Sequence, residues 1–227
     1  MRPASVAINV TGTLNAIDDL RAAGVHTIFL SSDAVFDGSP GLRSEADEPS
    51  PVLSYGRDKR AVEVHLEEQP GPWTILRLTK VIAGFPDRRN LLSEWLAEIE
   101  RGQPLRCATD QMLTPVDVAY VARAILFIIE TGMQGAFHIA GSEAVTRHSL
   151  AHRLLAHLPR AIRDQAVVHP CSIVEFSGLE QLPRNCALSN AKFVALSGMR
   201  PRSVDELCAE FGTSAAADRG FALRVDA

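Results

Sequence analysis

A tyrosine and a lysine stand four residues apart in the segment Ser54–Lys59, which reads SYGRDK. Residues i and i+4 share one face of an α-helix, so a helix through this segment would turn both side chains toward one site. A phenol has an ordinary pKa of about 10, and a neighbouring ammonium lowers that pKa toward the range useful for acid–base chemistry. Tyr55 and Lys59 are therefore our first candidates for catalysis. An exposed pair at the start of a helix is the alternative that the spacing leaves open.

A hydroxyl group precedes this pair at the end of an apolar run. Residues 26–32 (HTIFLSS) predict a short buried strand that ends at Ser31 and Ser32, with Asp33 directly after it. In doubly wound sheets the carboxyl ends of the strands face the ligand crevice. A hydroxyl there is placed to bind a substrate carbonyl oxygen beside a tyrosine. A serine that only caps the following loop is the structural alternative.

Segments typical of strands and of helices alternate along the chain. This alternation predicts an α/β fold with a doubly wound parallel sheet, followed by a smaller α/β lobe. We expect strands at 26–32, 73–79 and 135–141, and helices at 4–23, 55–68 (with Ser54 as N-cap), 90–102, 114–132 (with Pro115 in its first turn), 146–158, 189–196 and 203–211.

The composition is that of an ordinary globular protein. The 227 residues are 46% hydrophobic, and the net charge of −4 argues against a nucleic-acid or membrane-surface partner, which would need a basic face. The four cysteines are widely spaced, as expected of reduced thiols. No apolar run approaches the ~18 residues that a membrane span needs. We therefore expect a cytoplasmic protein.

Several blocks of the sequence, taken together, resemble the extended short-chain dehydrogenase/reductases, and most closely their dTDP-4-dehydrorhamnose reductase branch. The resemblance covers most of the chain in order. It implies a Rossmann-like core in residues 1–140, incomplete at its N-terminal edge, and a mostly substrate-binding lobe in residues 141–227, with elements of the two interleaved. The blocks are INVTGT (8–13), FLSSDAVFDG (29–38), SEADEPSPVLSYGRDK (44–59), ILRLTKVIAG (75–84), ATDQMLTPVDVAYVARAI (108–125), GAFHIAG (135–141) and LPRNCALSNAKFVALSGMRPRS (182–203).

The resemblance also implies a reaction and a set of catalytic residues. Ser32 stands at the family's catalytic Ser/Thr, Tyr55 at its general acid, Lys59 at the partner of that acid, and Asn9 at a helix asparagine. The implied reaction delivers hydride from NADPH or NADH to a keto group of a nucleotide-activated sugar. Tyr55 would protonate the developing alkoxide, while Lys59 would lower the pKa of Tyr55 and hold the nicotinamide ribose. Ser32 would bind the carbonyl oxygen, and Ser31 is a further expected cofactor contact.

Two pairs of residues are implied on the substrate side. Arg184 and Asn185 resemble the family's approach to the sugar nucleotide, although a loop with a surface arginine fits equally well. Asp110 and Gln111 resemble an Asp-Gln pair before the substrate-side proline, with an ordinary turn as the alternative. The helices at 4–23 and 55–68 often form dimer contacts in such proteins, so a homodimer is also implied.

Two features argue against a dehydratase and against a metal site. The 4,6-dehydratases of this superfamily carry a glutamate where this chain has Ala34, so a dehydratase is disfavoured, whereas an epimerase that uses the same Ser-Tyr-Lys set stays open. His148 and His152 have helical spacing but no accompanying H-E-x-x-H pattern. We therefore expect no metal site.

One expected motif is missing from the sequence. A Gly-x-x-Gly-x-x-Gly turn holds the cofactor pyrophosphate in this superfamily. In this chain Gly38 and Gly41 lie after the strand that ends at Ser32, so they do not correspond to that turn. The resemblance to the family begins at the helix that precedes the family's fifth strand. About two βαβ units are then expected to be missing, which would leave the strand at 26–32 as a bare hydrophobic edge. Two interpretations stay open. The chain is a truncated reductase or epimerase, or it is a non-catalytic module like the regulatory subunit of methionine adenosyltransferase.

Overall fold

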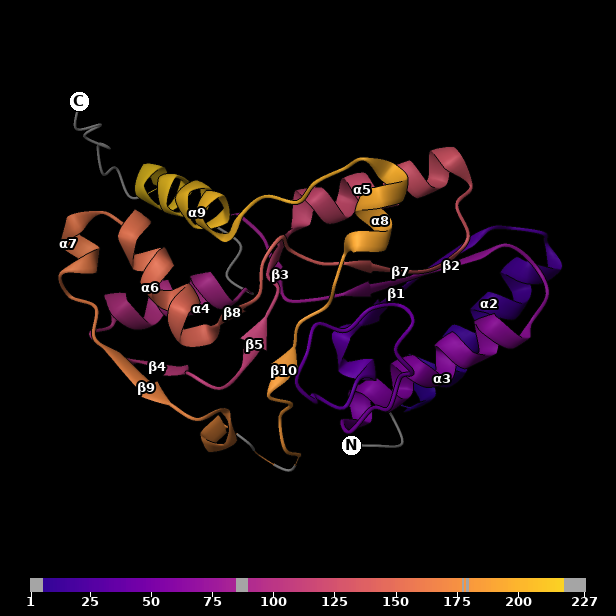
Figure 1. Cartoon of the computed structure of the whole chain (residues 1–227), viewed down its shortest axis with the longest axis horizontal. Coiled ribbons are helices and arrows are strands. Elements are labelled where there is room, and N and C mark those ends of the chain that lie inside the picture. The colour runs from indigo at the N-terminus through magenta and orange to yellow at the C-terminus, as the bar shows by residue number, and fades with distance from the viewer. Residues whose placement is uncertain (1–5, 85–89, 177, 179, 219–227) are drawn as a thin grey trace.

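The structure is a computed structural model that describes residues 6–84, 90–176, 178 and 180–218. The molecule has two halves (Figure 1). One half is built on a three-stranded parallel sheet with helices on both faces. The other half packs helices over short strands. Together they confirm the predicted α/β class and the doubly wound arrangement around the sheet.

The large sheet has the strand order β1-β2-β7, and all its strands are parallel. Its strands are β1 (Thr27–Ser32), β2 (Trp73–Leu78) and β7 (Gly135–Ile139). Ser32 lies in register with Leu78, which lies in register with Ile139, so the three carboxyl ends meet at one edge. Among the described residues β1 pairs only with β2, as predicted for a bare edge strand, and Leu30 is 41% exposed.

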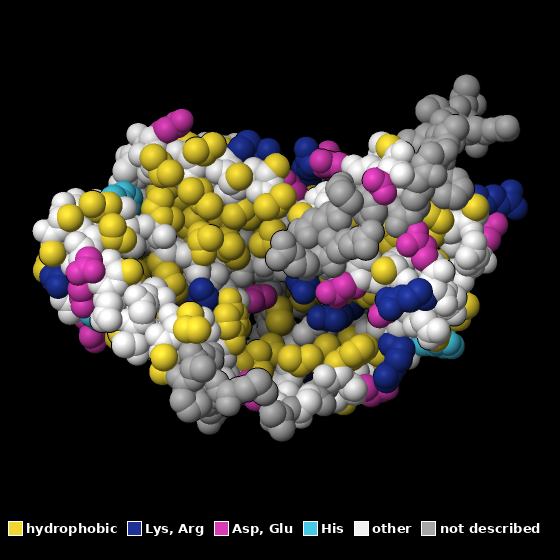
Figure 2. All heavy atoms as spheres, turned by 180° about the vertical axis from the view of Figure 1, so that it is seen from behind, with side chains coloured by type: hydrophobic (Ala, Val, Ile, Leu, Met, Phe, Trp, Pro, Cys, Tyr) yellow, Lys and Arg dark blue, Asp and Glu magenta, His cyan; other side chains and the backbone are white. Residues whose placement is uncertain are grey.

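Helices cover both faces of this sheet, because alternate residues of each strand point to opposite sides. One face carries the π-helical turn η1 (Ala7–Gly12), α2 (Thr13–Ala22) and α3 (Ser54–Glu68), whose core residues include Ile17 and Val62. The other face carries α5 (Val118–Thr131) and α8 (Ala191–Ser197), packed around Phe137 and Phe193. On this half of the molecule apolar side chains also gather at the surface (Figure 2).

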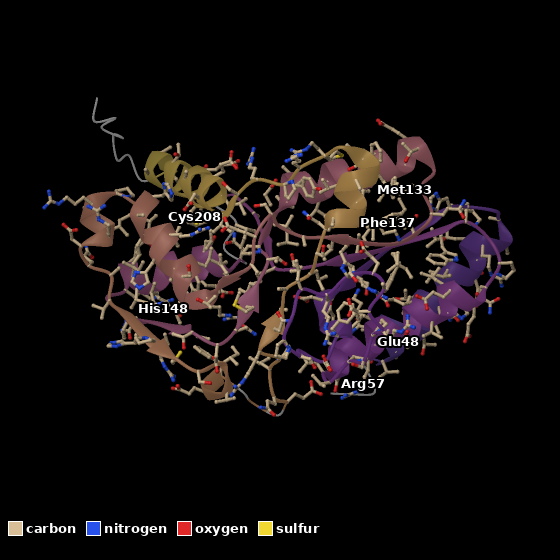
Figure 3. All side chains as sticks on the ribbon, viewed as in Figure 1. Glu48, Arg57, Met133, Phe137, His148 and Cys208 are labelled. Atoms are coloured by element: carbon tan, nitrogen blue, oxygen red, sulfur yellow. The ribbon has the colours of Figure 1, made fainter. Side chains whose placement is uncertain are left out.

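The second half has its own apolar core. Its elements are α4 (Leu91–Glu100), β4 (Leu105–Ala108), α6 (Arg147–His157), α7 (Arg160–Arg163), β9 (Val168–Cys171) and α9 (Val204–Asp218). Trp95, Leu154, Cys208 and Phe211 belong to this core. Figure 3 shows Cys208 among these helices and Phe137 in the large sheet.

Short strands join the two halves. They are β3 (Val81–Ile82), β5 (Met112–Leu113), β6 (Val116–Asp117), β8 (Val145–Thr146) and β10 (Asn185–Cys186), and the remaining elements are the 3₁₀ turns η2 (Asp33–Val35) and η3 (Ile173–Phe176). The chain crosses between the halves repeatedly: α4 and β4 belong to the second core, whereas α8 returns to the first. The two cores therefore draw on interleaved segments of the chain. The division into domains near residue 140 stays a prediction.

Two helix starts differ from the prediction. Helix α5 begins at Val118 rather than near 114, because residues 116–117 pair with β3 and the Asp117 carboxylate caps the helix by accepting the Tyr120 backbone N–H at 2.7 Å. Pro115 therefore precedes the helix. The N-cap of α3 is Leu53, and the Ser54 hydroxyl instead donates to Glu180.

None of the described helices combines the length and apolar character that crossing a membrane requires.

Candidate active site

The carboxyl end of β1 presents a serine and an aspartate. The Ser32 hydroxyl donates to the Asp33 carboxylate at 2.8 Å and accepts the backbone N–H of Ala34 at 3.2 Å, so Ser32 also caps η2. Burial raises the pKa of Asp33 to about 6, although the hydrogen bonds from Ser32 and Ala34 and the charge of Lys80 oppose this shift. Asp33 is a site residue that the sequence prediction did not include.

Helix α3 begins directly against the loop that follows β1. A Cβ atom on Gly56 would lie 1.9 Å from the Ala34 carbonyl oxygen, so only glycine allows this approach. The contact brings Tyr55 close enough to Asp33 for the carboxylate to act on its phenol. Tyr55 is 49% exposed, and its hydroxyl has no hydrogen-bond partner among the described residues. The phenol therefore faces open space beside Asp33.

The close approach at Gly56 predicts a measurable cost of substitution. Gly56→Ala should lower the free energy of unfolding by about 1–3 kcal/mol, the usual cost of forcing extra atoms into a packed contact. Gly12→Ala is the matched control, because its Cβ would meet only the Ala7 carbonyl oxygen, at 3.4 Å, and alanine favours a helix. Urea denaturation measures both variants. Equal free energies of unfolding for Gly56→Ala and Gly12→Ala would contradict the close contact at Gly56.

Lys59 occupies the next turn of α3 but is directed toward β1. Its ammonium donates to the Leu30 carbonyl oxygen at 2.7 Å and lies 4.7 Å from the centroid of the Phe29 ring and 5.7 Å from that of the Tyr55 ring. Burial raises the pKa of Tyr55, and the Asp33 carboxylate raises it further. The prediction that Lys59 lowers the pKa of Tyr55 is therefore wrong for this arrangement. Tyr55 stays protonated at neutral pH, which suits a proton donor.

The serine beside Ser32 has a different environment. The Ser31 side chain is buried, because alternate residues of β1 face opposite sides, and its hydroxyl donates to a Glu63 carboxylate oxygen at 2.6 Å. The cofactor contact predicted for Ser31 therefore has no support from its hydroxyl. That hydroxyl helps instead to hold α3 on the sheet.

Glu63 is the centre of a buried polar row under the site. Arg77 on β2 donates to both of its carboxylate oxygens, at 3.0 and 2.9 Å, and both side chains are almost completely buried. Arg77 also lies 3.5 Å from the His138 ring on β7, and burial lowers the pKa of His138 to about 3, so that ring is neutral. Glu63 follows Tyr55 and Lys59 at i+8 and i+4 on α3. The pair therefore fixes the face of the helix that carries them.

The sequence held a signal for this row that our prediction did not use. Glu63 continues the Tyr55–Lys59 spacing by one more turn, and Arg77 interrupts an otherwise apolar strand. A charged residue in a buried strand needs a partner of opposite charge. The two observations together point to a pair between the helix and the strand.

The raised pKa of Asp33 predicts a pH-dependent effect on stability. Its folded pKa of about 6 lies above the ordinary value of 3.8, so the stabilisation from the protonated form is complete below pH ~4 and is lost as the pH rises through 6. Asp33→Asn should therefore raise the free energy of unfolding at pH 7.5 by about 1–2 kcal/mol, after a discount for partial exposure, and should give no gain at pH 4. Thermal unfolding at the two pH values measures this. A gain of equal size at both would contradict it.

Asn9 lies on the π-helical turn η1, which packs against α3. Its side chain is exposed, and it interacts with a neighbour in the structure. The structure therefore places Asn9 on an element that contacts the helix of Tyr55 and Lys59. Its catalytic role stays a prediction.

The predicted substrate-side residues gather where β5 and β10 pair. Asp110 accepts hydrogen bonds from the Ser172 hydroxyl and the Ile173 backbone N–H, which lower the pKa of Asp110, and it lies 3.8 Å from Arg184. The Arg184 side chain is 62% exposed. The buried Gln111 amide donates to the Pro183 carbonyl oxygen at 2.9 Å. Arg184 is thus the substrate-side candidate whose charged group is open to solvent.

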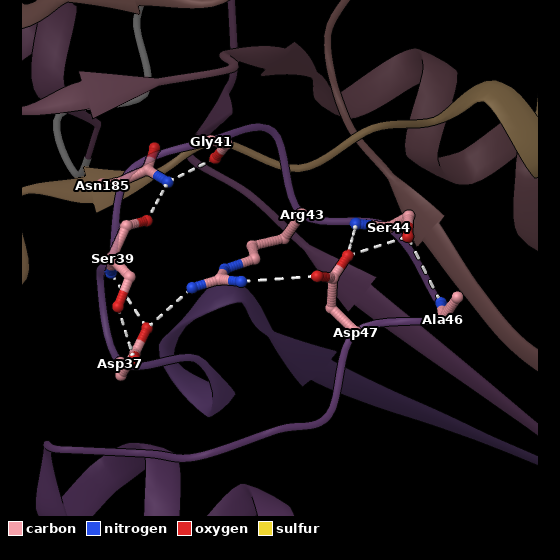
Figure 4. Close-up of polar contacts among 8 residues, drawn as sticks. All are labelled: Asp37, Ser39, Gly41, Arg43, Ser44, Ala46, Asp47 and Asn185. Carbon is pink, nitrogen blue, oxygen red and sulfur yellow. Dashed lines mark hydrogen bonds and ion pairs between the residues drawn. The ribbon is translucent and has the colours of Figure 1, made fainter.

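Asn185 connects the lobe to the loop after β1 (Figure 4). Its amide nitrogen donates to the Ser39 and Gly41 carbonyl oxygens, at 2.7 and 2.5 Å. A Cβ on Gly38 would lie 2.6 Å from the Pro183 Cβ atom. The Gly38–Gly41 loop is therefore packed on the lobe, beside a cleft of about 310 Å³ between residues 37–39 and 181–184. Its glycines serve this contact rather than a phosphate cradle.

His148 and His152 lie on one face of α6 with their Nε2 atoms 3.3 Å apart. Within the described ranges no group of three or more His, Cys, Asp or Glu side chains is arranged to hold a metal ion.

A family profile described as the RmlD substrate binding domain matches residues 2–215. The chain belongs to this family. Among curated proteins it is 33% identical over 156 residues to "Probable low-salt glycan biosynthesis reductase Agl14" of Haloferax volcanii, covering 66% of this chain and 51% of that protein. It is 27% identical to the dTDP-4-dehydrorhamnose reductase of Sinorhizobium fredii, with 86% and 68% covered. The chain thus spans about half to two-thirds of the length of these RmlD-family relatives.

A third relative is not named as a reductase. Methionine adenosyltransferase 2 subunit beta of Bos taurus is 26% identical over 208 residues, which cover 85% of this chain and 59% of that protein.

Solved structures share the fold of this RmlD-family chain. The dTDP-4-dehydrorhamnose reductase of Clostridium acetobutylicum superposes with a TM-score of 0.79 at 23% identity, covering 89% of this chain and 70% of the other. The Bacillus anthracis reductase in complex with NADP gives 0.78 at 22%, with the same coverage. MoeE5 in complex with UDP-glucuronic acid and NAD gives 0.73 at 20%, with 92% and 71% covered. At these identities the likeness establishes the Rossmann-like fold alone.

Proposed function

We propose that this chain carries the acid–base and substrate-binding half of an NAD(P)H-dependent reductase that acts on a keto group of a nucleotide-activated sugar, of the dTDP-4-dehydrorhamnose type. The observation that carries the proposal is the meeting of Ser32, Tyr55 and Lys59 at the carboxyl end of β1, with a protonated, half-exposed phenol. Membership of the RmlD family and the reductases among its relatives support it.

The side chains divide the work in a way that follows from their surroundings. The Ser32 hydroxyl binds the substrate carbonyl oxygen. To do so, the hydroxyl gives up its hydrogen bond to Asp33 and donates to the substrate. Tyr55 donates its proton to the same oxygen as negative charge develops there, and the raised pKa ensures that it has a proton to give. Lys59 lies one turn further along the same helix face, where its ammonium would bind the nicotinamide ribose rather than shift the pKa of Tyr55.

The residues present fit one end of a nicotinamide cofactor. NADPH or NADH supplies hydride when bound. Tyr55 and Lys59 are the residues that would hold its nicotinamide ribose, since both offer polar groups at the carboxyl end of an edge strand. The sequence contains no Gly-x-x-Gly-x-x-Gly turn for the pyrophosphate.

A second function is favoured by a specific similarity. Methionine adenosyltransferase 2 subunit beta is 26% identical to this chain over 208 residues. A non-catalytic binding or regulatory module would keep the sugar-nucleotide or partner surface without hydride transfer.

Product analysis separates the two functions. The chain is incubated with excess NADPH and dTDP-4-dehydrorhamnose, and the nucleotide sugars are analysed by mass spectrometry. A reductase yields a product two hydrogens heavier than the substrate, and a dTDP-sugar without a keto group stays unchanged. Saturable binding of the keto sugar without any reduced product would support the module and overturn the reductase.

A further inference from the structure

The first turn of α3 is capped by a residue from a distant segment. Tyr55 is the second residue of this helix, and the first backbone N–H groups of a helix have no partner within the helix. The N-cap residue Leu53 has an apolar side chain that cannot accept them. Glu180 lies 126 positions beyond Ser54, in the segment between η3 and β10, and its Oε1 atom accepts the Ser54 backbone N–H at 2.9 Å. Glu180 therefore takes the place of a local cap.

Two side chains of the same turn add to this contact. The Ser54 hydroxyl donates to Glu180 Oε1 at 2.5 Å, and the Arg57 guanidinium donates to the same oxygen at 3.2 Å. Arg57 also donates to the Val52 carbonyl oxygen at 2.8 Å, just ahead of the helix. One carboxylate oxygen thus accepts three hydrogen bonds from the turn that carries Tyr55. Its negative charge lies at the positive end of the helix dipole, which is the favourable end for an anion.

The segment that carries Glu180 is fixed by contacts of its own. The buried Gln111 amide donates to the Pro183 carbonyl oxygen at 2.9 Å. Asn185 donates to the Ser39 carbonyl oxygen at 2.7 Å (Figure 4), and β10 pairs with β5. Glu180 therefore reaches α3 from a segment that is itself anchored on both halves of the molecule.

The same segment also carries Arg184, whose side chain is 62% exposed. Arg184 follows Glu180 by four positions, and the cleft of about 310 Å³ lies between residues 181–184 and residues 37–39. Tyr55 directly follows the residue whose backbone N–H Glu180 accepts. Glu180 thus connects one wall of this cleft to the start of the helix that carries the proposed proton donor.

We infer that Glu180 is a positioning residue, which holds the first turn of α3 so that Tyr55 stays at the carboxyl end of β1. The inference rests on the proposed function for the role of Tyr55. The close contact of Gly56 with the Ala34 carbonyl oxygen places this turn against the loop after β1, and Glu180 holds the same turn from the other segment. Without the cap the end of the helix frays. A misplacement of about 1 Å can lower a catalytic rate about 100-fold.

The ionisation of Tyr55 tests its position without any substrate. In a Tyr120→Phe background Tyr55 is the sole tyrosine, so NMR titration of the ¹³C-labelled tyrosine ring gives its pKa directly. Burial and the Asp33 carboxylate raise this pKa in the folded chain, and release of the turn should move it back toward the ordinary value of about 10. We expect this shift with Glu180→Ala and not with Glu180→Gln, whose amide oxygen still accepts from Ser54.

Glu175→Ala is the matched control. The Glu175 side chain is 47% exposed, against 38% for Glu180, and it pairs with Arg106 and accepts the Ser172 backbone N–H instead of contacting α3. Thermal unfolding verifies that each variant is folded at the pH of the titration. With NADPH and dTDP-4-dehydrorhamnose, Glu180→Ala should lower kcat about 10-fold and leave KM within about 2-fold of wild type. Glu175→Ala should change neither constant.

The outcomes distinguish this inference from the proposed function. A Tyr55 pKa that does not respond to Glu180→Ala, or a kcat equal to that of the wild type, overturns the positioning role and leaves a sugar-nucleotide reductase standing. Equal pKa shifts in Glu180→Ala and Glu175→Ala also overturn it, because they would reflect a general loosening of the fold. The expected shift in a chain that reduces no keto sugar supports the positioning role and counts against the proposed function.

Discussion

Replacing Tyr55 with phenylalanine is expected to lower the rate of keto reduction about 10²- to 10⁴-fold, the usual contribution of a positioned general acid. The phenol lies beside Ser32 and Asp33 at the end of β1, and its raised pKa keeps it protonated at neutral pH. Phenylalanine keeps the ring and removes only the proton donor. Steady-state rates with saturating keto sugar measure the change.

The same substitution should leave stability and substrate affinity almost unaltered, because the Tyr55 hydroxyl has no partner among the described residues. The chain's other tyrosine provides a matched control. Tyr120 is buried, and its hydroxyl donates to the Met199 carbonyl oxygen at 3.2 Å, so Tyr120→Phe should cost about 1 kcal/mol of stability without loss of rate. A Tyr55→Phe variant as active as Tyr120→Phe would remove Tyr55 from the mechanism.

Breaking the Glu63–Arg77 pair is expected to have the largest effect on stability. Glu63→Ala leaves Arg77 buried without a carboxylate partner, which typically costs about 3–5 kcal/mol. Arg77→Ala should cost less than Glu63→Ala, because Arg60 still pairs with Glu63 at 3.2 Å. The Glu63 and Arg77 side chains are almost completely buried and share two hydrogen bonds. Chemical denaturation at neutral pH measures the loss. Single variants within 1 kcal/mol of wild type would contradict a buried ion pair.

The double variant shows whether this pair also orients the site. Glu63→Gln combined with Arg77→Met removes both charges and should recover much of the stability lost by either single alanine variant, because no unpaired charge remains. If the pair fixes the helix face of Tyr55 and Lys59, the recovered protein will still reduce the keto sugar more slowly, with its affinity for dTDP unchanged. Full recovery of both stability and rate would limit Glu63 and Arg77 to a structural role.

The elements with clear periodicity were predictable from the sequence. The strand that ends at Ser32, the helix of Tyr55 and the amphipathic helix α4 lie within a few residues of their predicted bounds. Short strands such as β5 and β10 were not predicted, because two residues carry no period and their pairing depends on segments far apart in the chain. For the same reason the sequence did not indicate where the two cores divide.

The site was predictable in its residue types but not in its electrostatics. Spacing and resemblance brought Ser32, Tyr55 and Lys59 to one strand end, where the structure also has them. The pKa of Tyr55 is raised first by burial and then by the nearby Asp33 carboxylate. Neither is visible in a one-dimensional pattern. The alternation of Ser31 and Ser32 across the strand could have assigned Ser31 to the core.

Transfer of an isotopic label tests the central claim most directly. The chain is incubated with saturating NADPH that carries deuterium at the transferable position of the nicotinamide, together with dTDP-4-dehydrorhamnose, and the nucleotide sugar is analysed by mass spectrometry. We predict that deuterium reaches the former carbonyl carbon with the wild-type chain, even at a slow rate, and not with Tyr55→Phe. Absence of label with the wild-type chain, or equal labelling by both proteins, would contradict the assignment of Tyr55 as the proton donor of a reductase.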